Sequence, residues 1–236
     1  MDTSRILTFG CHHIPYHHID SISFLKEVKK AVQPTLYIHM GDEIDAHGMS
    51  YHESDPDLDA PGPEYRKALN YISEVYDITD GVKTFVMESN HGSMVYRRAK
   101  TAGIPKEMLK PYKEIWKAPS SWTWRPDLTL ELPDGQQCHF AHQLGMNSLL
   151  SSQSKGMNVV QAHNHHKFDI QFWSASDHVL NFGAHCGSLV DQDSLAMAYG
   201  KVYRYKCALG CMAIVDSKPI PFPMKLDKRG RWIGRL

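Results

Sequence analysis

The sequence lacks the features that mark several large classes of protein. No segment approaches the roughly 20 consecutive apolar residues of a membrane-spanning helix, and Asp2 and Arg5 interrupt the apolar run that a signal peptide needs. The chain carries no net charge, because its 26 basic residues equal its 26 acidic residues. Bulk charge therefore draws it neither to a polyanion nor to an anionic membrane. The sequence also contains no internal repeat and no low-complexity stretch.

Cysteine is scarce, and its spacing fits no disulfide framework. The five cysteines are odd in number and show no disulfide pattern in their spacing, which favours a reducing compartment, and we expect a cytoplasmic protein. Cys207 and Cys211 leave two interpretations open. They are either half of a zinc site or ordinary buried thiols, and the second is favoured because no further cysteine pair lies nearby.

What the chain does contain is a regular alternation of apolar runs and amphipathic segments. Its 236 residues, 42% apolar and 22% charged, are enough to bury a sizeable core, and we expect a single domain over residues 1–236. Strands are predicted at 6–9, 35–40 and 82–87, with helices at 22–32 and 64–76 between them. Asp20 stands where a residue would cap the first helix. Further helices are predicted at 92–102 and 106–116.

From about residue 120 the pattern changes to short strands. A hairpin is predicted at 128–142, and further strands at 158–162, 168–173, 178–182 and 212–215. Strand–helix–strand units followed by a β-rich half predict an α/β fold, a four-layer αββα sandwich of two mixed β-sheets flanked by helices. The polar segment 46–63 is predicted to be an insertion loop, either a rim or lid beside the site or a simple solvated loop.

Residue types that bind metals follow five of the predicted strands. A carboxylate at the end of a buried strand is costly unless it is paired or bound to a cation, and ligands of open α/β sheets lie at the carboxyl ends of strands. Five such ends together predict one polynuclear metal centre. The residues concerned are Cys11, His12, His13, Asp42, Asp45, Asn90, His91, His142, His163, Asn164 and His165.

The order of these motifs resembles that of the calcineurin-like metallophosphoesterase superfamily. Family members carry Asp-x-His, Gly-Asp-x-x-Asp, Gly-Asn-His, a lone His and Gly-His-x-His. The matching segments here are Cys11–His13, Gly41–Asp45, Ser89–His91, His142 and Ala162–His165. Three positions depart from the pattern, because Cys11 replaces an Asp while Ser89 and Ala162 each replace a Gly. Only the first departure changes a metal ligand.

The resemblance implies a dinuclear centre with a separate ligand set for each cation. It implies two divalent or trivalent ions, of which manganese, zinc and iron are the expected ones. Asp42 would bridge the two ions, since a carboxylate offers two donor oxygens. The implied ligands of the first site are Cys11, His13, Asp42 and His165, and those of the second are Asp42, Asn90, His142 and His163.

The Cys11 ligand changes the expected choice of metal. A thiolate is softer than a carboxylate and favours zinc or iron over magnesium or manganese. The alternative is that Cys11 stays protonated and the first site is weak or empty.

The resemblance also implies roles for residues that do not bind metal. His91 corresponds to the histidine that acts as general acid beside the leaving group. Asp45 matches the carboxylate that orients this histidine in the phosphoprotein-phosphatase branch, so an Asp45–His91 dyad is expected unless Asp45 only caps a turn. Arg97 and Arg98 follow within two helical turns and are predicted to bind substrate phosphate, although either could equally lie on a solvated face.

These implications predict a metal-dependent phosphoric ester hydrolase in which a hydroxide bridging the two metals attacks phosphorus. The phosphoprotein-phosphatase branch carries Arg and Glu where this chain has Ala46 and Gly92. A phosphodiesterase or nuclease-type activity is therefore favoured over a protein phosphatase. A phosphomonoesterase is the first alternative, and a metal-binding protein with weakened catalysis is the second.

The expected partner is a phosphate ester, with nucleotides and nucleic acids among the candidates. Trp116, Trp122 and Trp124 either stack on a base or pack in the core. A basic C-terminal segment either contacts a nucleic-acid backbone or lies in solvent. Its cationic residues are Lys225, Lys228, Arg229, Arg231 and Arg235.

Overall fold

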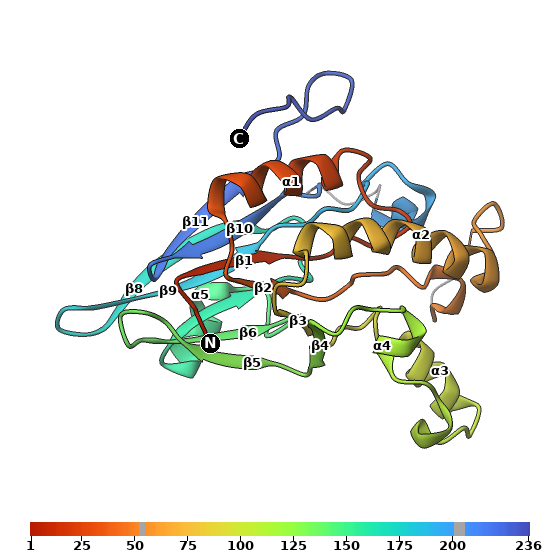
Figure 1. Cartoon of the computed structure of the whole chain (residues 1–236), viewed down its shortest axis with the longest axis horizontal. Helices are drawn as coiled ribbons and strands as arrows, with labels where there is room; N and C mark the ends of the chain where they lie inside the picture. The colour runs from red at the N-terminus through yellow and green to blue at the C-terminus, as the bar shows by residue number, and fades with distance from the viewer. Residues whose placement is uncertain (52–54, 201–205) are drawn as a thin grey trace.

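The first of two sheets is built from the predicted strand–helix–strand units, in a computed structural model that describes residues 1–51, 55–200 and 206–236. Its strands are β1 (Arg5–Phe9), β2 (Leu36–His39), β3 (Thr84–Met87), β4 (Trp122–Arg125), β10 (Gly210–Val215) and β11 (Lys218–Pro223). Their order is β11-β10-β1-β2-β3-β4 (Figure 1). Strands β1 to β4 are parallel, whereas β10 and β11 extend one edge in antiparallel pairing.

The second sheet comes from the β-rich half of the chain. Its strands are β5 (Leu128–Glu131), β6 (Gln137–Ala141), β7 (Asn158–Gln161), β8 (Phe168–Ser176) and β9 (Val179–Cys186). They follow the order β5-β6-β7-β9-β8. Strands β6, β7 and β9 are parallel, and β5 and β8 close the two edges in antiparallel pairing. Both sheets are therefore mixed.

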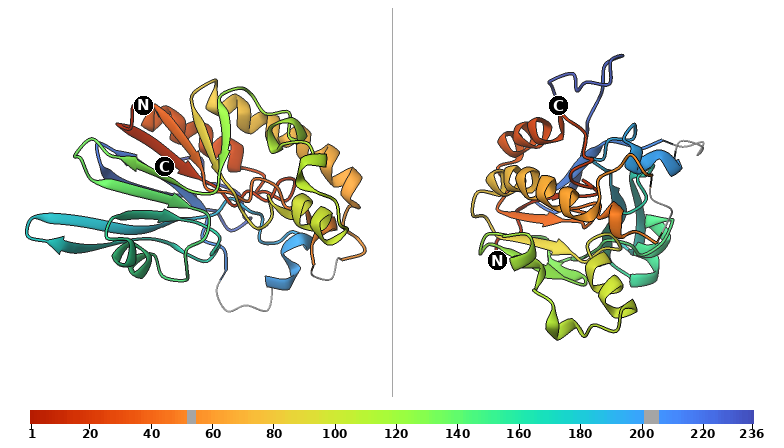
Figure 2. Two further views of the ribbon diagram at one scale, coloured as in Figure 1. Left: turned by 90° about the horizontal axis from the view of Figure 1, so that it is seen from below. Right: turned by 90° about the vertical axis from the view of Figure 1, so that its right-hand side faces the viewer.

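Helices cover the outer faces of the two sheets (Figure 2). Helices α1 (Ser21–Val32) and α2 (Pro61–Thr79) pack side by side over the first sheet, and α5 (Ser148–Lys155) packs on β7, β8 and β9 of the second. This arrangement confirms the predicted αββα sandwich. The remaining helical segments are short: η1 (His47–Met49), α3 (Met94–Thr101), η2 (Lys106–Met108), α4 (Tyr112–Ile115) and η3 (Leu195–Gly200).

Two hydrophobic layers hold the sandwich together. Successive residues of a strand point to opposite faces, so Ile6 faces the second sheet while Leu7 faces the helices. The layer between the sheets also contains Ile38, Phe140 and Val160, all fully buried. Each such side chain stabilises the fold by roughly 1.5–3 kcal/mol relative to exposure. Packing on both faces explains why these strands are continuously apolar rather than alternating.

Several predictions of local structure need correction. The single helix predicted at 106–116 is replaced by η2 and α4, because Pro111 cannot continue a helix begun at Lys106 and instead precedes a new one. Strands β4 and β11 and helix α5 were not predicted from the sequence. Strand β11 contains three prolines and lies at the edge of its sheet, where a missing N–H is tolerated.

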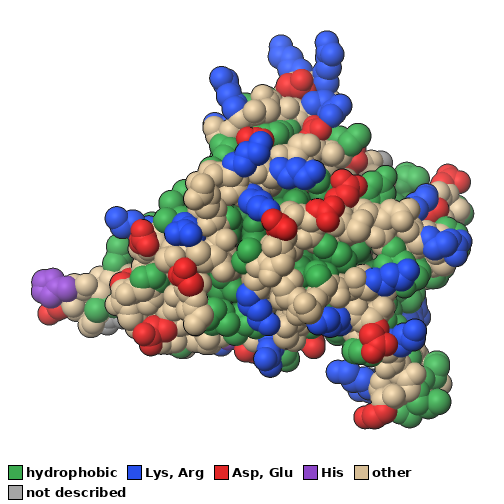
Figure 3. Space-filling view, viewed as in Figure 1, with side chains coloured by type: hydrophobic (Ala, Val, Ile, Leu, Met, Phe, Trp, Pro, Cys, Tyr) green, Lys and Arg blue, Asp and Glu red, His purple; other side chains and the backbone are tan. Residues whose placement is uncertain are grey.

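The C-terminal segment contacts the start of α1, while its five cationic side chains are exposed to solvent, as one of the two predictions has it (Figure 1). Asp20 precedes α1, but its side chain makes no capping hydrogen bond, which corrects the sequence prediction. Its carboxylate instead accepts hydrogen bonds from Arg231 Nε at 2.7 Å and from the Trp232 backbone N–H at 2.9 Å. The Trp232 ring packs edge-on against Phe24, with 5.7 Å between centroids. Figure 3 shows Lys and Arg side chains gathered at the top of the molecule, where Figure 1 draws the C-terminal segment.

The predicted insertion loop 46–63 falls partly outside the described residues, which omit positions 52–54. Its described part contains η1, and α2 begins inside it at Pro61. Among the residues that the structure describes, no helix combines the length and the apolar character that crossing a bilayer requires.

The Asp20 anchor predicts a pH-dependent contribution to stability. Hydrogen bonding to Arg231 lowers the pKa of Asp20 from 3.8 to about 2, so its contribution is complete above the unfolded value and is lost as pH falls toward about 2. Replacing Asp20 with Ala should lower the melting temperature near neutral pH by roughly 1–3 °C. Calorimetry across this pH range should show the difference from the wild type vanishing in acid.

The matched control for this prediction is Glu27→Ala. It removes a carboxylate from α1, the helix that Asp20 precedes, and the ion pair of Glu27 with Lys30 is exposed. An equal effect of both substitutions would contradict an anchoring role for Asp20.

Candidate metal centre

The predicted ligands lie at one edge of the sandwich, where the carboxyl ends of β1, β2, β3, β6 and β7 meet. Several of them have left-handed backbone conformations, with φ of 47° at Cys11, 52° at His13, 50° at Asp42 and 67° at His163. Such values are uncommon for residues with a side chain and cluster at functional sites. All four residues lie two to four positions after the end of a strand, where the chain turns.

Gly41 allows the two sheets to approach each other at this edge. Its φ is 92°, and a Cβ there would lie 2.7 Å from Ser89 Cβ and 2.8 Å from His142 Nδ1. Only glycine fits this position, which explains the glycine of the Gly-Asp motif.

The first donor set combines both sheets. Cys11, His13, Asp42 and His165 each present a ligand atom, and all four atoms lie within 4.8 Å of one another. The Nε2 atoms of His13 and His165 are 3.0 Å apart, and His13 Nε2 is 3.5 Å from Asp42 Oδ2. Lone pairs that converge this closely form the kind of donor set that takes up a cation.

The second donor set shares Asp42 with the first. His142 and His163 join Asp42 with ligand atoms within 4.8 Å of one another. His142 Nε2 lies 3.2 Å from Asp42 Oδ2, 3.2 Å from His163 Nδ1 and 3.0 Å from Asn90 Oδ1. The four residues assigned to the second site by resemblance are thus brought together around one imidazole nitrogen.

The protonation states of these groups fit cation binding. Burial lowers the pKa of His13 to about 3 and holds that of His165 well below its usual range, so both imidazoles are neutral. Burial alone would raise the pKa of Asp42, but the imidazoles of His142 and His91 outweigh it and hold that carboxyl ionised. The neutral imidazoles of His13 and His165 and the ionised carboxylate of Asp42 are in the ligand states that zinc, manganese and iron require.

His142 differs from its neighbours. Burial opposes its charge, but the adjacent Asp42 carboxylate outweighs burial and raises the pKa of His142. A cation bound here therefore competes with the proton that His142 shares with Asp42, as metal ions do at histidine sites generally.

Cys11 is buried among the donors. Its Sγ accepts a hydrogen bond from the His163 N–H at 3.4 Å, and burial raises the pKa of the thiol well above its usual range. The thiol therefore keeps its proton until a thiophilic ion displaces it. This environment suits zinc or iron better than a hard cation.

Ser89 has a structural function that the sequence analysis did not predict. Its Oγ accepts hydrogen bonds from the backbone N–H of Asp42 at 2.9 Å and from that of Gly92 at 3.0 Å. One hydroxyl thus joins the loop after β2 to the loop after β3. The only signal in the sequence is that a serine stands where the family motif has a glycine.

The carboxylate of Asp45 lies closer to His13 than to His91. Asp45 Oδ1 is 2.8 Å from His13 Nδ1 and 3.5 Å from His91 Nδ1. The His91 ring donates its Nδ1–H instead to the backbone carbonyl of Asp45. A carboxylate behind a metal-binding histidine fixes which ring nitrogen carries the proton. Asp45 therefore orients His13 through its side chain and His91 through its main chain.

The predicted phosphate-binding arginines contact the loop that follows the site. Arg98 donates from Nε to the Met49 carbonyl at 2.6 Å and also to the Ser50 carbonyl, and its guanidinium lies 4.0 Å above the Tyr51 ring. Arg97 lies 5.0 Å from the same ring. Neither arginine belongs to the donor sets, and Arg98 holds the loop in place.

The three tryptophans proposed to stack on a base have other surroundings. Trp116 and Trp122 are buried in the core beneath the helices. Trp124 donates from Nε1 to the Glu43 carboxylate at 3.0 Å. These contacts favour packing over base stacking. Glu43 itself is fully buried next to Asp42, and its pairing with Trp124 was not predicted from the sequence.

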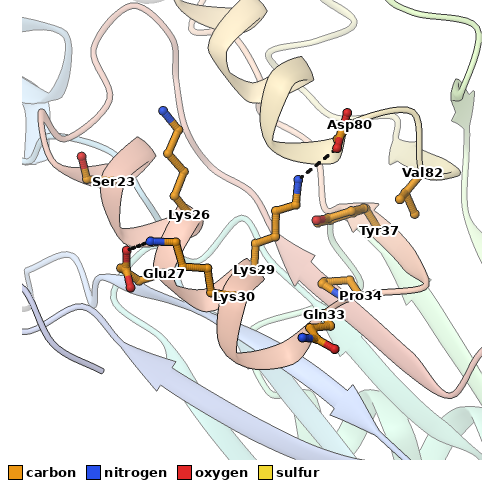
Figure 4. A pocket seen from close by; sticks show the side chains of 10 residues that line it. All are labelled: Ser23, Lys26, Glu27, Lys29, Lys30, Gln33, Pro34, Tyr37, Asp80 and Val82. Atoms are coloured by element: carbon orange, nitrogen blue, oxygen red, sulfur yellow. Dashed lines mark hydrogen bonds and ion pairs between the residues drawn. The ribbon is translucent and has the colours of Figure 1, made fainter.

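A surface depression lies at the opposite edge of the first sheet (Figure 4). Gln33 and Pro34 in its lining precede β2, and Val82 precedes β3, so the depression is at the amino ends of the strands. Its lysines include Lys29, which pairs with Asp80 at 3.7 Å. The depression is separate from the metal-binding residues.

Comparison with known proteins shows the fold. No family model and no curated protein matches the sequence. Among solved structures, Vps29 from Chaetomium thermophilum is similar with a TM-score of 0.50 and 11% identity, covering 97% of this chain and 91% of that one. Yfce, a phosphoesterase from E. coli, has a TM-score of 0.46 and 10% identity, and the match covers 97% of this chain and 96% of that one. Nuclease MPE from Pseudomonas putida has a TM-score of 0.41 and 11% identity, and the match covers 92% of this chain and 87% of that one.

The chain thus shares the fold of Vps29, and this fold is the two-sheet sandwich that the sequence predicts. At this low identity the similarity establishes the fold alone. Function has to be argued from the donor sets.

Replacing Cys11 with Asp should change which metal the protein retains. A carboxylate in place of the thiol makes the first donor set harder, so bound zinc should fall and bound manganese should rise after dialysis against equal concentrations of both. Plasma mass spectrometry of the dialysed protein measures this ratio. Cys138→Ser, which alters a buried thiol outside the donor sets, is the control. Unchanged metal content in Cys11→Asp would contradict a ligand role for Cys11.

Proposed function

We propose that this protein is a metal-dependent phosphoesterase with a dinuclear centre. The observation that supports the proposal most directly is the position of Asp42, whose carboxylate belongs to both donor sets. A single carboxylate shared by two groups of nitrogen and sulfur donors suits a pair of adjacent cations. Manganese, zinc and iron are the ions that this mixture of imidazole, carboxylate and thiol favours.

The residues of the chain would hold the reacting groups in fixed positions. Two bound cations would neutralise phosphate charge and lower the pKa of a water molecule between them. The Ser89 hydroxyl fixes the loop of Asp42 against the loop of His91, so the carboxylate and the imidazole keep a constant separation. Asn90 offers a neutral oxygen, which adds no negative charge beside an anionic substrate.

His91 is proposed as the general acid. Its ring lies 4.5 Å from that of His13 between centroids, and the Asp45 carbonyl accepts its Nδ1–H. Nε2 is therefore the atom that would carry a proton to the leaving-group oxygen. Burial opposes the charged form, but the carboxylates of Asp42 and Asp45 outweigh it and raise the pKa of His91. A raised pKa keeps the donor form populated near neutrality.

The surroundings of His91 support a phosphodiesterase rather than a protein phosphatase. The glutamate that follows this histidine in phosphoprotein phosphatases would be crowded here, because a Cβ at Gly92 would lie 3.0 Å from Ser89 Oγ and 3.3 Å from the Glu43 carboxylate, whose negative charge would also oppose a second carboxylate. The arginine of that branch is replaced by Ala46, which is buried. At position 46 the site therefore lacks a cationic side chain that could neutralise the second negative charge of a phosphomonoester.

We further propose that residues 1–236 act as one domain, because the donor sets extend from Cys11 to His165 and both sheets contribute to them. The cytoplasm remains the proposed location, on the basis of the odd number of cysteines. A phosphate ester, including a nucleotide or a nucleic acid, remains the proposed substrate.

Metal analysis combined with a substrate screen tests the proposed function. Metal-free protein should take up two equivalents of manganese or zinc and should hydrolyse bis-p-nitrophenyl phosphate faster than p-nitrophenyl phosphate. Asp42→Asn should abolish turnover and reduce bound metal at both sites, because its carboxylate serves both. Asp134→Asn, at an exposed hairpin position, is the control.

The outcomes of this screen separate the alternatives. Faster turnover of the monoester would assign a phosphomonoesterase. Two tightly held metals without turnover of either ester would assign a metal-binding protein whose catalysis was lost with the change to Cys11. Fewer than two bound metals would contradict the dinuclear centre itself.

His91→Gln tests the general acid separately. Loss of the proton donor should lower kcat by about 10²–10⁴ for a dinucleotide, whose alkoxide leaving group needs protonation, with bound metal unchanged. The loss should be much smaller for a p-nitrophenyl ester of a nucleotide, because p-nitrophenolate leaves without a proton. His178→Gln, at an exposed hairpin, is the control. Equal losses for the two substrates would exclude the assigned role.

A further inference from the structure

A buried amide lies directly behind the histidines of the second sheet. Gln161 is the last residue of β7, two positions before His163, and is completely buried. Its Oε1 accepts the Leu144 N–H at 3.2 Å, while its Nε2 lies 3.1 Å from the Gly145 carbonyl oxygen and 2.7 Å from His185 Nε2. Both polar atoms of the amide are therefore hydrogen-bonded, so the side chain has one favourable orientation.

A second histidine and a carboxylate fix that orientation. His185, on the neighbouring strand β9, donates from Nδ1 to Asp169 Oδ1 at 2.9 Å. With the proton on Nδ1, the Nε2 lone pair accepts a hydrogen bond from Gln161. The amide nitrogen must then face His185, which leaves the amide oxygen for Leu144. Asp169 is itself held by Ser148 Oγ at 3.2 Å, where α5 begins.

The hydrogen bonds from Asp169 through His185 to Gln161 form a relay, and this relay ends on the loop that follows His142. Leu144 and Gly145 come two and three residues after this histidine. The Gly145 carbonyl accepts a second hydrogen bond, at 3.0 Å, from the side chain of Asn164. Asn164 lies between His163 and His165 in sequence. One peptide group is thus tied both to the strand before His163 and to the turn that bears it.

We propose that Gln161 is a positioning residue for the metal centre, with His185 and Asp169 acting through it. The relay sets the position of the His142 loop relative to the His163 turn, and hence the 3.2 Å separation of His142 Nε2 and His163 Nδ1. The inference rests on the proposed function, since it assumes that these two histidines bind one cation. Residues behind metal ligands characteristically change metal affinity by about 10–100-fold when they are removed.

Zinc titration of the metal-free protein tests the positioning function. Gln161→Met has a side chain of similar length but cannot form the three hydrogen bonds, and its apolar body suits a buried site. Competition with a chromophoric chelator should show two zinc equivalents in the wild type. In Gln161→Met one equivalent should keep its affinity and the other should weaken by about 10–100-fold. Cobalt in place of zinc should show altered visible absorption at one site.

Asn158→Ala provides a matched control. Asn158 begins the same strand β7, is also buried, and its Oδ1 accepts the Phe182 N–H at 2.8 Å. Its removal should destabilise the sheet and leave both zinc affinities unchanged, because it lies at the strand end away from the ligands. An equal loss of zinc affinity in Asn158→Ala and Gln161→Met would overturn the positioning function in favour of general destabilisation.

Two substitutions of Asp169 test the relay behind the amide. Asp169→Ala removes the acceptor for His185 Nδ1–H, so the weaker zinc site should lose affinity in the same direction as in Gln161→Met. Asp169→Asn keeps an oxygen that can accept this hydrogen bond and should restore the affinity. Asp169 is partly exposed, so both variants are expected to fold. If Gln161→Met does not fold, the zinc affinities of these two Asp169 variants alone test the positioning function.

The results distinguish failure of this inference from failure of the proposed function. Wild-type zinc affinities in folded Gln161→Met, or in Asp169→Ala, would overturn the relay while leaving a dinuclear centre intact. Fewer than two zinc equivalents in the wild type would overturn the proposed function, and this inference with it.

Discussion

The structure depends on keeping one ionised carboxylate buried at the edge of two sheets. Asp42 is almost completely inaccessible, and an isolated buried charge would be strongly destabilising. The fold surrounds it with imidazoles, and the backbone N–H of His91 donates to its Oδ1 at 3.2 Å. The left-handed turn at Asp42, the glycine before it and the Ser89 hydroxyl all serve to hold this carboxylate where donors from both sheets can reach it.

The sandwich architecture explains why these donors come from distant parts of the chain. Parallel strands bring their carboxyl ends to one edge, and face-to-face packing places the edge of the second sheet opposite that of the first. The apolar layer between the sheets fixes their separation. Residues 11–45 approach the centre from one side and residues 142–165 from the other, so both donor sets that contain Asp42 combine residues from the two halves of the chain.

Much of this arrangement could be predicted from the sequence because it depends on local patterns. Apolar runs predicted most of the strands, and the order of the Asp, Asn and His motifs predicted which side chains converge. What could not be predicted depends on partners distant in sequence. Nothing near Asp45 indicates that its carboxylate faces His13, and nothing near Asp20 indicates that it binds Arg231. Helix α5 has a weak apolar face and was missed, since packing on the second sheet rather than periodicity stabilises it.

The division of the donors between two sheets has a consequence for the protein in a cell. A cation bound by His13 from the first sheet and by His165 from the second would cross-link the two sheets. Ligands that bind only the native state stabilise it by mass action. Resistance to proteolysis, and with it the abundance of the protein, would then rise and fall with the supply of the ion. The stability of the protein would then depend on the concentration of free metal ion around it.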